Sequence, residues 1–274
     1  MVSTSDFVKR PLEGLSAERD LVAMRQLIPA ATMTAKASHD FGGGDVLIAS
    51  ILPMNWPSLK RDDGTVLLGM QATLPGNDLS RGLGQALKQA LEAEPGTSFA
   101  QVALEEDSPR LQEVLDPDGF APIQVHDDFE FWLDAGAERT EQITKGLEEA
   151  NAAIMTTRAV PGLDHAFWVD TGSKLHLRWV VDADEDQVID AIARLHSRRE
   201  SSLGDATKYV GSFRADGLTV PVWDLPSGMS AEDVAEGAQQ FASRFEEARA
   251  VTEPLTALER RARGAIVARQ VTLR

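Results

Sequence analysis

The stretch KLHLRW places three nitrogen-bearing side chains two residues apart. Alternate residues of a β-strand face the same side, so Lys174, His176 and Arg178 would form a row on one strand face. Arginine offers an anion a planar fork of N–H donors, and histidine titrates near neutral pH. We therefore treat this row as a candidate contact for a small anionic ligand. The alternative is a solvated face, or one whose cations pair with some of the 43 acidic residues.

A second polar group lies in YVGSFRADGLTVPVWDLPSG, residues 209–228, which holds the only tyrosine of the chain. Asp216 and Gly217 are typical of a two-residue type I′ turn, so the stretch predicts a β-hairpin. Counting outward from this turn places Tyr209 opposite Asp224. A buried phenol needs a hydrogen-bond partner, and this carboxylate could supply it.

The other face of the same hairpin carries Arg214 and Trp223 and is predicted to be mostly wet. Pro221 has no N–H group to donate to a β-ladder, which favours an edge position for its strand. Amphipathic patterning explains most of this hairpin. Tyr209, Arg214 and Asp224 remain candidate ligand contacts if they share a cleft with the Lys174 row.

The C-terminal segment, residues 255–274, is basic within an acidic chain and carries a net charge of +4. Arg260, Arg261 and Arg263 are its candidate partner contacts. One interpretation is that a basic helix packs on the acidic body of the same chain. A second is that it docks an acidic protein partner. A third, docking to a ribosome or nucleic acid, predicts an association that weakens as salt rises.

Composition argues against several kinds of chemistry. The chain has no cysteine, which excludes disulfides, thiolate nucleophiles and cysteine-ligated zinc. Its five histidines lack the spacing that puts two metal ligands on one helix face. Asp182 starts a D-x-D-x-D run like that of a calcium loop, but the glycine and the glutamate that such a loop needs are missing. FGGGD lacks the context of a phosphate loop, and no Gly-x-Ser-x-Gly elbow occurs. We predict no metal and no cofactor, and no catalytic residue can be named.

One grouping stays open. The stretch HDDFE, residues 126–130, brings a histidine and three carboxylates close together in the sequence. An oxygen-rich metal site or an acid–base site is one interpretation of this pattern. The other is solvated side chains, which an acidic chain produces freely.

The net charge of −16 repels phosphate backbones and anionic lipid headgroups. General nucleic-acid binding and membrane-surface binding are therefore disfavoured. The first residues lack the apolar core of a secretory signal, and no later apolar run has the length of a membrane span. We expect a cytoplasmic protein that acts as a monomer or a small oligomer.

Hydrophobic periodicity predicts the elements that must position these residues. Apolar side chains recur at helical spacing before and after groups of strands, and turn residues separate the elements. We expect an α+β fold with two similar halves, residues 1–120 and 121–274, each a mainly antiparallel sheet with flanking helices. The predicted helices span residues 17–28, 79–93, 141–154 and 184–198, and the predicted strands span 32–38, 46–52, 65–72, 165–170 and 174–181. Asp78 is the predicted cap of the second helix, Ser230 caps a further predicted helix, and Thr256 with Glu259 opens another.

A short internal similarity accompanies this order. PAATMTAKA at residues 29–37 and NAAIMTTRA at residues 151–159 align as A-A-x-M-T-x-[KR]-A, each after a predicted helix and before a predicted strand pair. An internal duplication of a helix–strands–helix unit would explain the match. Chance similarity over nine positions is the alternative.

Several stretches together resemble an actinobacterial family of proteins of unknown function. They are RPLEGLSAERDLVAMRQLIPAAT, DDGTVLLGMQ, HLRWV, YVGSFRADGLTVPVWDLP and TALERRARGAIVARQVTLR, which are distributed over the whole chain. The resemblance implies no reaction and supplies no catalytic residues. Many members of that family begin with a segment rich in lysine and arginine, which this sequence lacks.

These observations favour a non-catalytic binding or protein-interaction module, because no nucleophile motif, cofactor loop or metal spacing is recognisable. The alternative is an enzyme that acts on a small anionic substrate. In that enzyme His176 would be the acid–base group and Arg178 would hold the anion. An enzyme predicts a concave pocket around these two residues, whereas an interaction module predicts an exposed apolar patch or groove.

Overall fold

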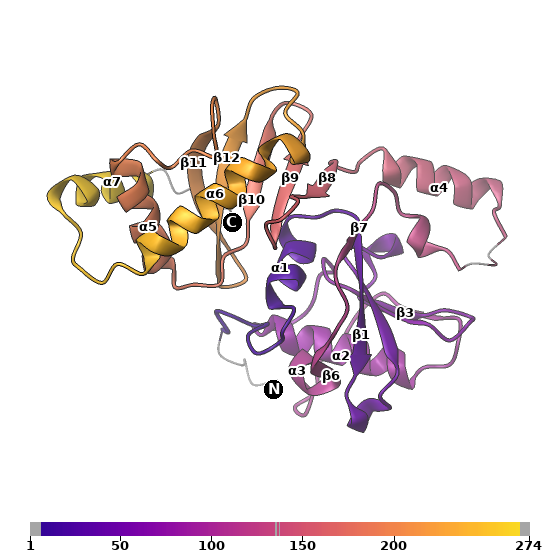
Figure 1. The fold of residues 1–274 in the computed structure, drawn as a ribbon. Coiled ribbons are helices and arrows are strands. Elements are labelled where there is room, and N and C mark those ends of the chain that lie inside the picture. Colours follow the sequence, from indigo (N-terminus) through magenta and orange to yellow (C-terminus); the bar gives the residue numbers. More distant parts are fainter. Residues whose placement is uncertain (1–6, 135, 137, 269–274) are drawn as a thin grey trace. The chain divides into compact units, whose positions relative to one another are not determined.

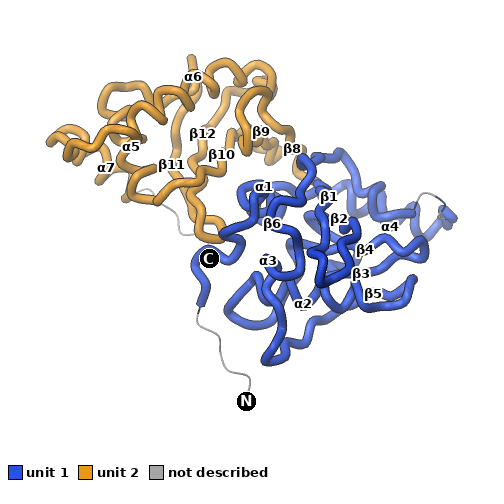
Figure 2. Tube along the Cα trace, turned by 60° about the horizontal axis from the view of Figure 1, so that its bottom comes forward, with its two compact units in different colours: residues 1–154 blue, residues 155–274 orange. Residues whose placement is uncertain are grey.

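The computed structural model describes residues 7–134, 136 and 138–268. The chain has a mixed α+β fold, as the sequence predicts, and forms two compact units, residues 1–154 and 155–274 (Figure 2). Each unit contains one β-sheet with helices packed on it (Figure 1).

The first unit holds a seven-stranded sheet with the order β5-β3-β4-β2-β1-β6, and β7 also pairs with β1. β2 and β4 are parallel, and the other neighbouring strands are antiparallel. The elements of this unit are α1 (Glu18–Gln26), β1 (Ala31–Ala37), η1 (His39–Phe41), β2 (Asp45–Ala49), η2 (Pro53–Asn55), β3 (Ser58–Lys60), β4 (Val66–Gly69), α2 (Leu79–Glu92), β5 (Thr97–Phe99), α3 (Leu111–Val114), β6 (Leu115–Phe120), β7 (Gln124–Val125), η3 (Glu130–Trp132) and α4 (Glu141–Asn151).

Helix α2 shows why the sequence predicts this unit well. Asp78 caps the helix by accepting a 3.0 Å hydrogen bond from the Ser80 N–H group. Leu83, Leu87 and Ala90 recur at helical spacing and are fully buried. The helix therefore packs this apolar stripe against β3, β4 and β5.

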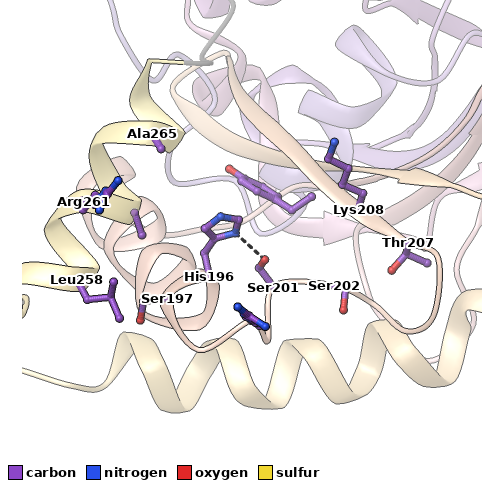
Figure 3. Close-up of a pocket in the computed structure, with 12 residues that line it drawn as sticks. His196, Ser197, Ser201, Ser202, Thr207, Lys208, Leu258, Arg261 and Ala265 are labelled. Atoms are coloured by element: carbon purple, nitrogen blue, oxygen red, sulfur yellow. Dashed lines mark hydrogen bonds between the residues drawn. The ribbon is translucent and has the colours of Figure 1, made fainter.

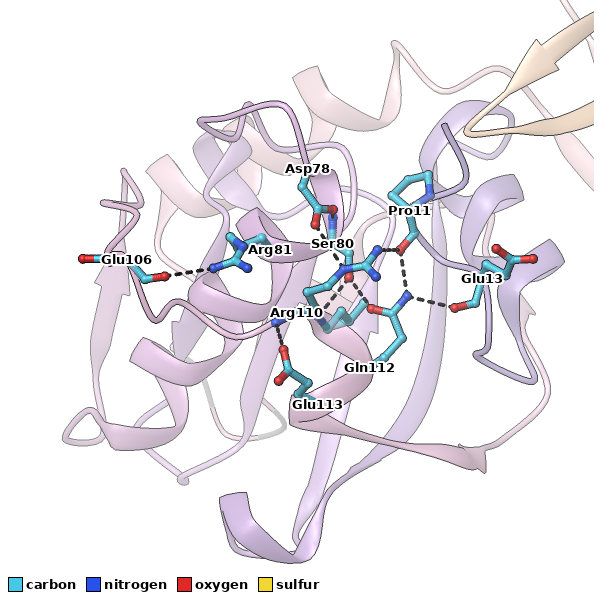
Figure 4. A network of polar contacts seen from close by, with 10 residues as sticks. Pro11, Glu13, Asp78, Ser80, Arg81, Glu106, Arg110, Gln112 and Glu113 are labelled. Atoms are coloured by element: carbon cyan, nitrogen blue, oxygen red, sulfur yellow. Dashed lines mark hydrogen bonds and ion pairs between the residues drawn. The ribbon is translucent and has the colours of Figure 1, made fainter. Parts of the chain in front are cut away.

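A polar network ties the start of the chain to α2 and α3 (Figure 4). The Arg110 guanidinium donates to the Pro11 carbonyl at 3.1 Å and lies 3.1 Å from an Asp78 carboxylate oxygen. The Gln112 amide donates to the same Pro11 carbonyl at 2.7 Å and to the Glu13 carbonyl at 3.0 Å. These donors satisfy backbone carbonyls of a segment that has no regular partner. We interpret the network as structural.

Residues 121–154 group with the first compact unit, residues 1–154. β7 pairs with β1, and the Trp132 indole N–H donates to the Ile51 carbonyl at 2.8 Å. The predicted helix at 141–154 corresponds to α4, which likewise lies in this unit and not at the start of the second.

The second unit holds a fully antiparallel five-stranded sheet with the order β11-β12-β10-β9-β8. Its elements are β8 (Thr157–Ala159), β9 (Ala166–Asp170), β10 (Leu175–Trp179), α5 (Glu185–Ser197), β11 (Lys208–Ala215), β12 (Leu218–Leu225), α6 (Ala231–Arg249) and α7 (Ala257–Val267).

The helices of this unit pack on one face of its sheet, and α5 contacts both α6 and α7 (Figure 1). Trp179 from β10 and Trp223 from β12 point into this core. The Trp179 ring meets the Phe245 ring edge to face at 5.2 Å, and the Trp223 ring meets the Phe241 ring at 4.9 Å. Aromatic pairs of this geometry add specificity to the burial of large apolar surfaces.

The hairpin β11–β12 agrees with the predicted register near its turn and departs from it further away. Asp216 and Gly217 both have positive φ, as a type I′ turn requires, and Gly211 pairs with Val222 as counted from the turn. A bulge between Tyr209 and Gly211 then shifts the register by one residue. Tyr209 therefore pairs with Trp223, so the predicted Tyr209–Asp224 pair was wrong.

The predicted wet face of the hairpin was also wrong. Trp223 is 0% exposed, because the face that carries it packs against the helices. β12 lies between β11 and β10, so Pro221 is not on an edge strand. The ladder between β12 and β10 ends at the Val222–Arg178 pair, next to Pro221, and resumes at an isolated bridge between Val181 and Thr219. The missing N–H group is thus accommodated by a gap in the ladder.

The two segments that suggested an internal duplication occupy different places in the sheets. Residues 29–37 contribute β1, which pairs with three strands of the first sheet. Residues 151–159 contribute β8, the edge strand of the second. The strand orders give the duplication no support.

Among the described residues, no helix is both long enough and apolar enough to cross a membrane.

Gly237 in α6 tests how closely this helix approaches the loop before β11. A Cβ atom at this position would lie 1.6 Å from the Leu203 carbonyl oxygen. We expect Gly237→Ala to destabilise the protein by about 1–3 kcal/mol, because the loop must move away. The control is Gly264→Ala in α7, where nothing lies within 4 Å, and this change should stabilise the protein by up to about 1 kcal/mol. Urea unfolding measures the free energy of unfolding of both variants. Equal values for Gly237→Ala and Gly264→Ala would contradict the close approach of α6 to the loop.

Candidate functional site

The loop between α5 and β11, the start of β11 and one face of α7 frame an open cleft in the second unit (Figure 3). Its volume is about 660 Å³. Twelve residues line it: His196, Ser197, Arg199, Ser201, Ser202, Thr207, Lys208, Tyr209, Leu258, Arg261, Ala262 and Ala265.

The cleft is basic. Arg199, Lys208 and Arg261 come from the three framing segments, and none makes a hydrogen bond through its side chain or an ion pair with any residue that the structure describes. Among the residues that the structure describes, no carboxylate lines the cleft. Figure 3 shows Lys208 and Arg261 on two sides of the cleft, with His196 and Ser201 between them. Three cationic side chains without described partners therefore line one concave surface.

Hydrogen bonds hold the floor of the cleft in place. His196 Nδ1 lies 2.9 Å from the Ser201 hydroxyl, and the Trp223 indole N–H donates to the Ser201 carbonyl at 2.8 Å. The buried Tyr209 hydroxyl lies 2.7 Å from the Ser212 hydroxyl. Burial raises the pKa of Tyr209 to about 12, so this phenol stays protonated at neutral pH.

Within the loop, the Thr207 hydroxyl accepts a hydrogen bond from the Leu203 N–H group at 2.8 Å and donates to the Gly204 carbonyl at 2.9 Å. The Arg244 guanidinium of α6 donates to the Ser202 carbonyl at 3.3 Å. These bonds replace the regular backbone pairing that a loop lacks. These bonds therefore fix the backbone of the loop, from which its other side chains extend into the cleft.

Helix α7 forms the remaining wall. A capping box between Thr256 and Glu259 starts the helix, as the sequence predicts. Arg263 binds Asp186 and Asp190 of α5 through N–O contacts of 2.6 and 2.7 Å. This pairing agrees with the intramolecular interpretation of the basic C-terminal segment for Arg263, whereas Arg261 lines the cleft. Arg260 donates to the Leu255 carbonyl of its own segment.

The row predicted on β10 lies on the sheet face opposite the helix-covered one. His176 is opposite Asp224 across the β10–β12 ladder, with Nδ1 3.0 Å from Oδ1. The Nδ1 atom makes no aligned hydrogen bond, and the contact is an ion pair only when the His176 ring is protonated. The Lys174 ammonium lies 3.1 Å from the other Asp224 oxygen. Lys174, His176 and Asp224 therefore form one cluster on this face.

Two titratable groups of this face have shifted pKa values. Burial lowers the pKa of His176, and the Arg178 and Lys174 cations lower it further, while Asp224 acts in the opposite direction. Burial also lowers the pKa of the Arg178 guanidinium. Arg178 makes no hydrogen bond or ion pair through its side chain with any described residue.

The structure separates the remaining candidate residues. Arg214 pairs with Glu185 at the start of α5, and this carboxylate raises the pKa of Arg214. Tyr209 and Arg261 are the predicted candidates that line the cleft. Neither His176 nor Arg178 lines it.

Sequence reasoning missed His196, Arg199, Ser202 and Lys208. The signal that could have found the first three is HSRRESS, residues 196–202, a basic and hydroxyl-rich run at the end of a helix of an acidic chain. Lys208 carries no comparable signal, because its place depends on the fold.

The group at residues 126–130 has local partners. His126 Nε2 lies 2.7 Å from the Thr32 hydroxyl, and its ring lies against Phe131 at 4.9 Å. Asp128 accepts from the Glu130 N–H group, and Glu130 pairs with Arg139. In the part of the chain that the structure describes, no three His, Asp or Glu side chains are arranged to hold a metal ion.

Comparison with known protein families gives a match that covers residues 11–274. The pattern of a family of unknown function, DUF5926, matches residues 11–274. The chain belongs to this family. No curated protein and no solved structure matches it. The DUF5926 match includes every element that frames the cleft and the β10 face.

The lowered pKa of His176 makes the stability of this DUF5926 protein depend on pH. The unfolded chain, with the ordinary histidine pKa of 6.5, takes up a proton more readily than the folded chain. The free energy of unfolding should therefore fall as pH drops from 7.5 to 5.5. In His176→Gln this fall should be smaller by about 0.5 kcal/mol.

Urea unfolding at several pH values measures this difference. His39→Gln is the matched control, because the His39 side chain is fully exposed. A pH slope in His176→Gln as steep as in the unchanged protein would contradict the assignment.

Proposed function

We propose that this protein is a binding module and that the cleft of its second unit holds an anionic group of the ligand. The observation that carries this proposal is that Arg199, Lys208 and Arg261, without ionic partners among the described residues, line one cleft whose described lining has no carboxylate. Unpaired cations gathered in a concave surface concentrate positive potential there.

The ion pairs of other cationic side chains in the second unit support this proposal. Six other cationic side chains in the described part of the same unit are engaged by carboxylates. These pairs are Lys174–Asp224, Arg194–Glu259, Arg198–Glu200, Arg214–Glu185, Arg249–Glu246 and Arg263 with Asp186 and Asp190. In a chain with a net charge of −16, three cations left together at one cleft therefore favour an external anion as their partner.

The size of the cleft supports the same function. Ligand sites for small molecules commonly have volumes of about 300–1,000 Å³ and combine apolar walls with a few polar groups. The cleft, at about 660 Å³, combines an apolar wall from α7 with the three cations. It can accept an anionic group together with the part of a ligand that carries it.

Isothermal titration with pyrophosphate and with citrate, at constant ionic strength, tests this function. Both anions should bind the full chain, and Arg261→Ala should weaken each about 10- to 100-fold, because one charge-assisted contact is lost. Arg260→Ala is the matched control, since it removes the neighbouring arginine, which does not line the cleft. Absence of binding, or equal weakening by both changes, would refute the proposal.

An enzyme acting on a small anionic substrate is a second candidate, favoured by the His176–Asp224 contact of 3.0 Å. Here Asp224 would orient the His176 ring, His176 would transfer a proton, and Arg178 would hold the anion. The absence of a described partner for the Arg178 guanidinium supports this role.

The His176 ring reports on this candidate directly. An anion bound beside Arg178 should raise the His176 pKa, because added negative charge favours the protonated ring. NMR titration of the ring with and without pyrophosphate measures that change, and Arg178→Gln should abolish it. An unchanged His176 pKa at saturating pyrophosphate would count against the enzyme.

A further inference from the structure

We infer that the cleft recognises a small organic phosphate, whose phosphate group contacts Arg199, Lys208 and Arg261 while its organic part lies against α7. This inference rests on the proposed function and specifies the class of ligand. It depends on where the three cations come from, on the apolar wall beside them, and on the backbone conformation of Arg199.

The cations approach from three separate segments. Arg199 follows the end of α5, Lys208 is the first residue of β11, and Arg261 lies on α7. A carboxylate presents two oxygens in one plane, whereas a phosphate monoester presents three terminal oxygens in different directions and carries a charge of about −1.5 to −2 at neutral pH. Donors from three segments around one cleft therefore match the three terminal oxygens of a phosphate better than the two oxygens of a carboxylate.

A neutral donor accompanies these cations. The Ser202 hydroxyl lines the cleft and makes no hydrogen bond with any described residue. By contrast, the Ser197, Ser201 and Thr207 hydroxyls already have partners within the chain. Ser202 can therefore donate to a ligand without breaking an existing bond.

The wall formed by α7 is apolar beside Arg261. Leu258, Ala262 and Ala265 follow a helical spacing of four and three residues, which places them on one face of the helix. The Leu258 side chain is 61% exposed, so much of its surface is available for contact. A phosphate ion alone would fill only part of the cleft, and this wall can accept the organic remainder of a ligand.

Arg199 is held in a conformation that favours glycine. It has φ +64° directly after Arg198, the C-cap residue of α5. The Arg199 N–H group donates to the His196 carbonyl at 3.1 Å, and the Glu200 N–H group donates to the Leu195 carbonyl at 2.9 Å. These two bonds form a Schellman motif, in which glycine is the usual residue at the position of Arg199. The backbone here is less stable with arginine than with glycine, and strain of this kind is found at functional sites.

The test compares three ligands by isothermal titration with the full chain at constant ionic strength and pH 7.5. They are phenyl phosphate, inorganic phosphate and citrate. Phenyl phosphate should bind at least about tenfold more tightly than inorganic phosphate, because its ring also buries apolar surface on α7. Citrate should bind about tenfold more weakly than phenyl phosphate.

Variants separate the phosphate contact from the apolar contact. Arg199→Gly should weaken phenyl phosphate and inorganic phosphate at least about tenfold. The same change should raise the thermal midpoint of the free protein by about 2–4 °C, because it relieves the strained backbone. Leu258→Ser should reduce only the advantage of phenyl phosphate over inorganic phosphate. Arg260→Ala should change neither affinity.

The outcomes distinguish this inference from the function on which it rests. Citrate binding as tightly as phenyl phosphate would overturn the phosphate assignment and leave an anion-binding module. Unchanged phenyl phosphate affinity in Arg199→Gly, with the expected rise in thermal midpoint, would remove Arg199 from the site and overturn the inference. No binding of any of the three anions would refute both.

Discussion

The buried Trp223 indole is the contact on which the cleft depends. Its N–H group holds the Ser201 carbonyl, and its ring packs edge to face against Tyr209 and Phe241. One side chain thus joins the sheet, helix α6 and the loop that carries Arg199. Because the indole is fully buried, its hydrogen bond is protected from competition by water. The polar surface of the cleft is built on an apolar core.

Local sequence patterns predicted the elements around this core well. The Asp78 cap of α2, the Ser230 and Thr256 capping boxes of α6 and α7, and the type I′ turn at Asp216 and Gly217 depend on residues close in sequence. Such features are encoded within a few positions, so one sequence suffices to predict them. The antiparallel character of the sheets followed from the same short strands and turns.

What the sequence could not predict depends on contacts between distant residues. Alternation of polar and apolar residues in β12 does not reveal which face the helices cover, so Trp223 was placed on the wet side. The bulge before Gly211 then moved Tyr209 away from Asp224. The cleft itself joins Arg199, Lys208 and Arg261 from three segments, and no spacing in the chain links them.

The pairing of Arg263 with two aspartates of α5 has a further consequence for α7. Successive helix residues are about 100° apart around the axis, so Arg261 and Arg263 project from nearly opposite sides. These two arginines of α7 therefore have different roles. Arg263 binds the helix to α5, and Arg261 remains available to a ligand. A single inserted residue between Thr256 and Arg261 would turn both arginines by about 100° around the helix axis and take Arg263 away from its two aspartates. The role of each arginine in the basic C-terminal segment therefore depends on its angular position around the helix axis as well as on its charge.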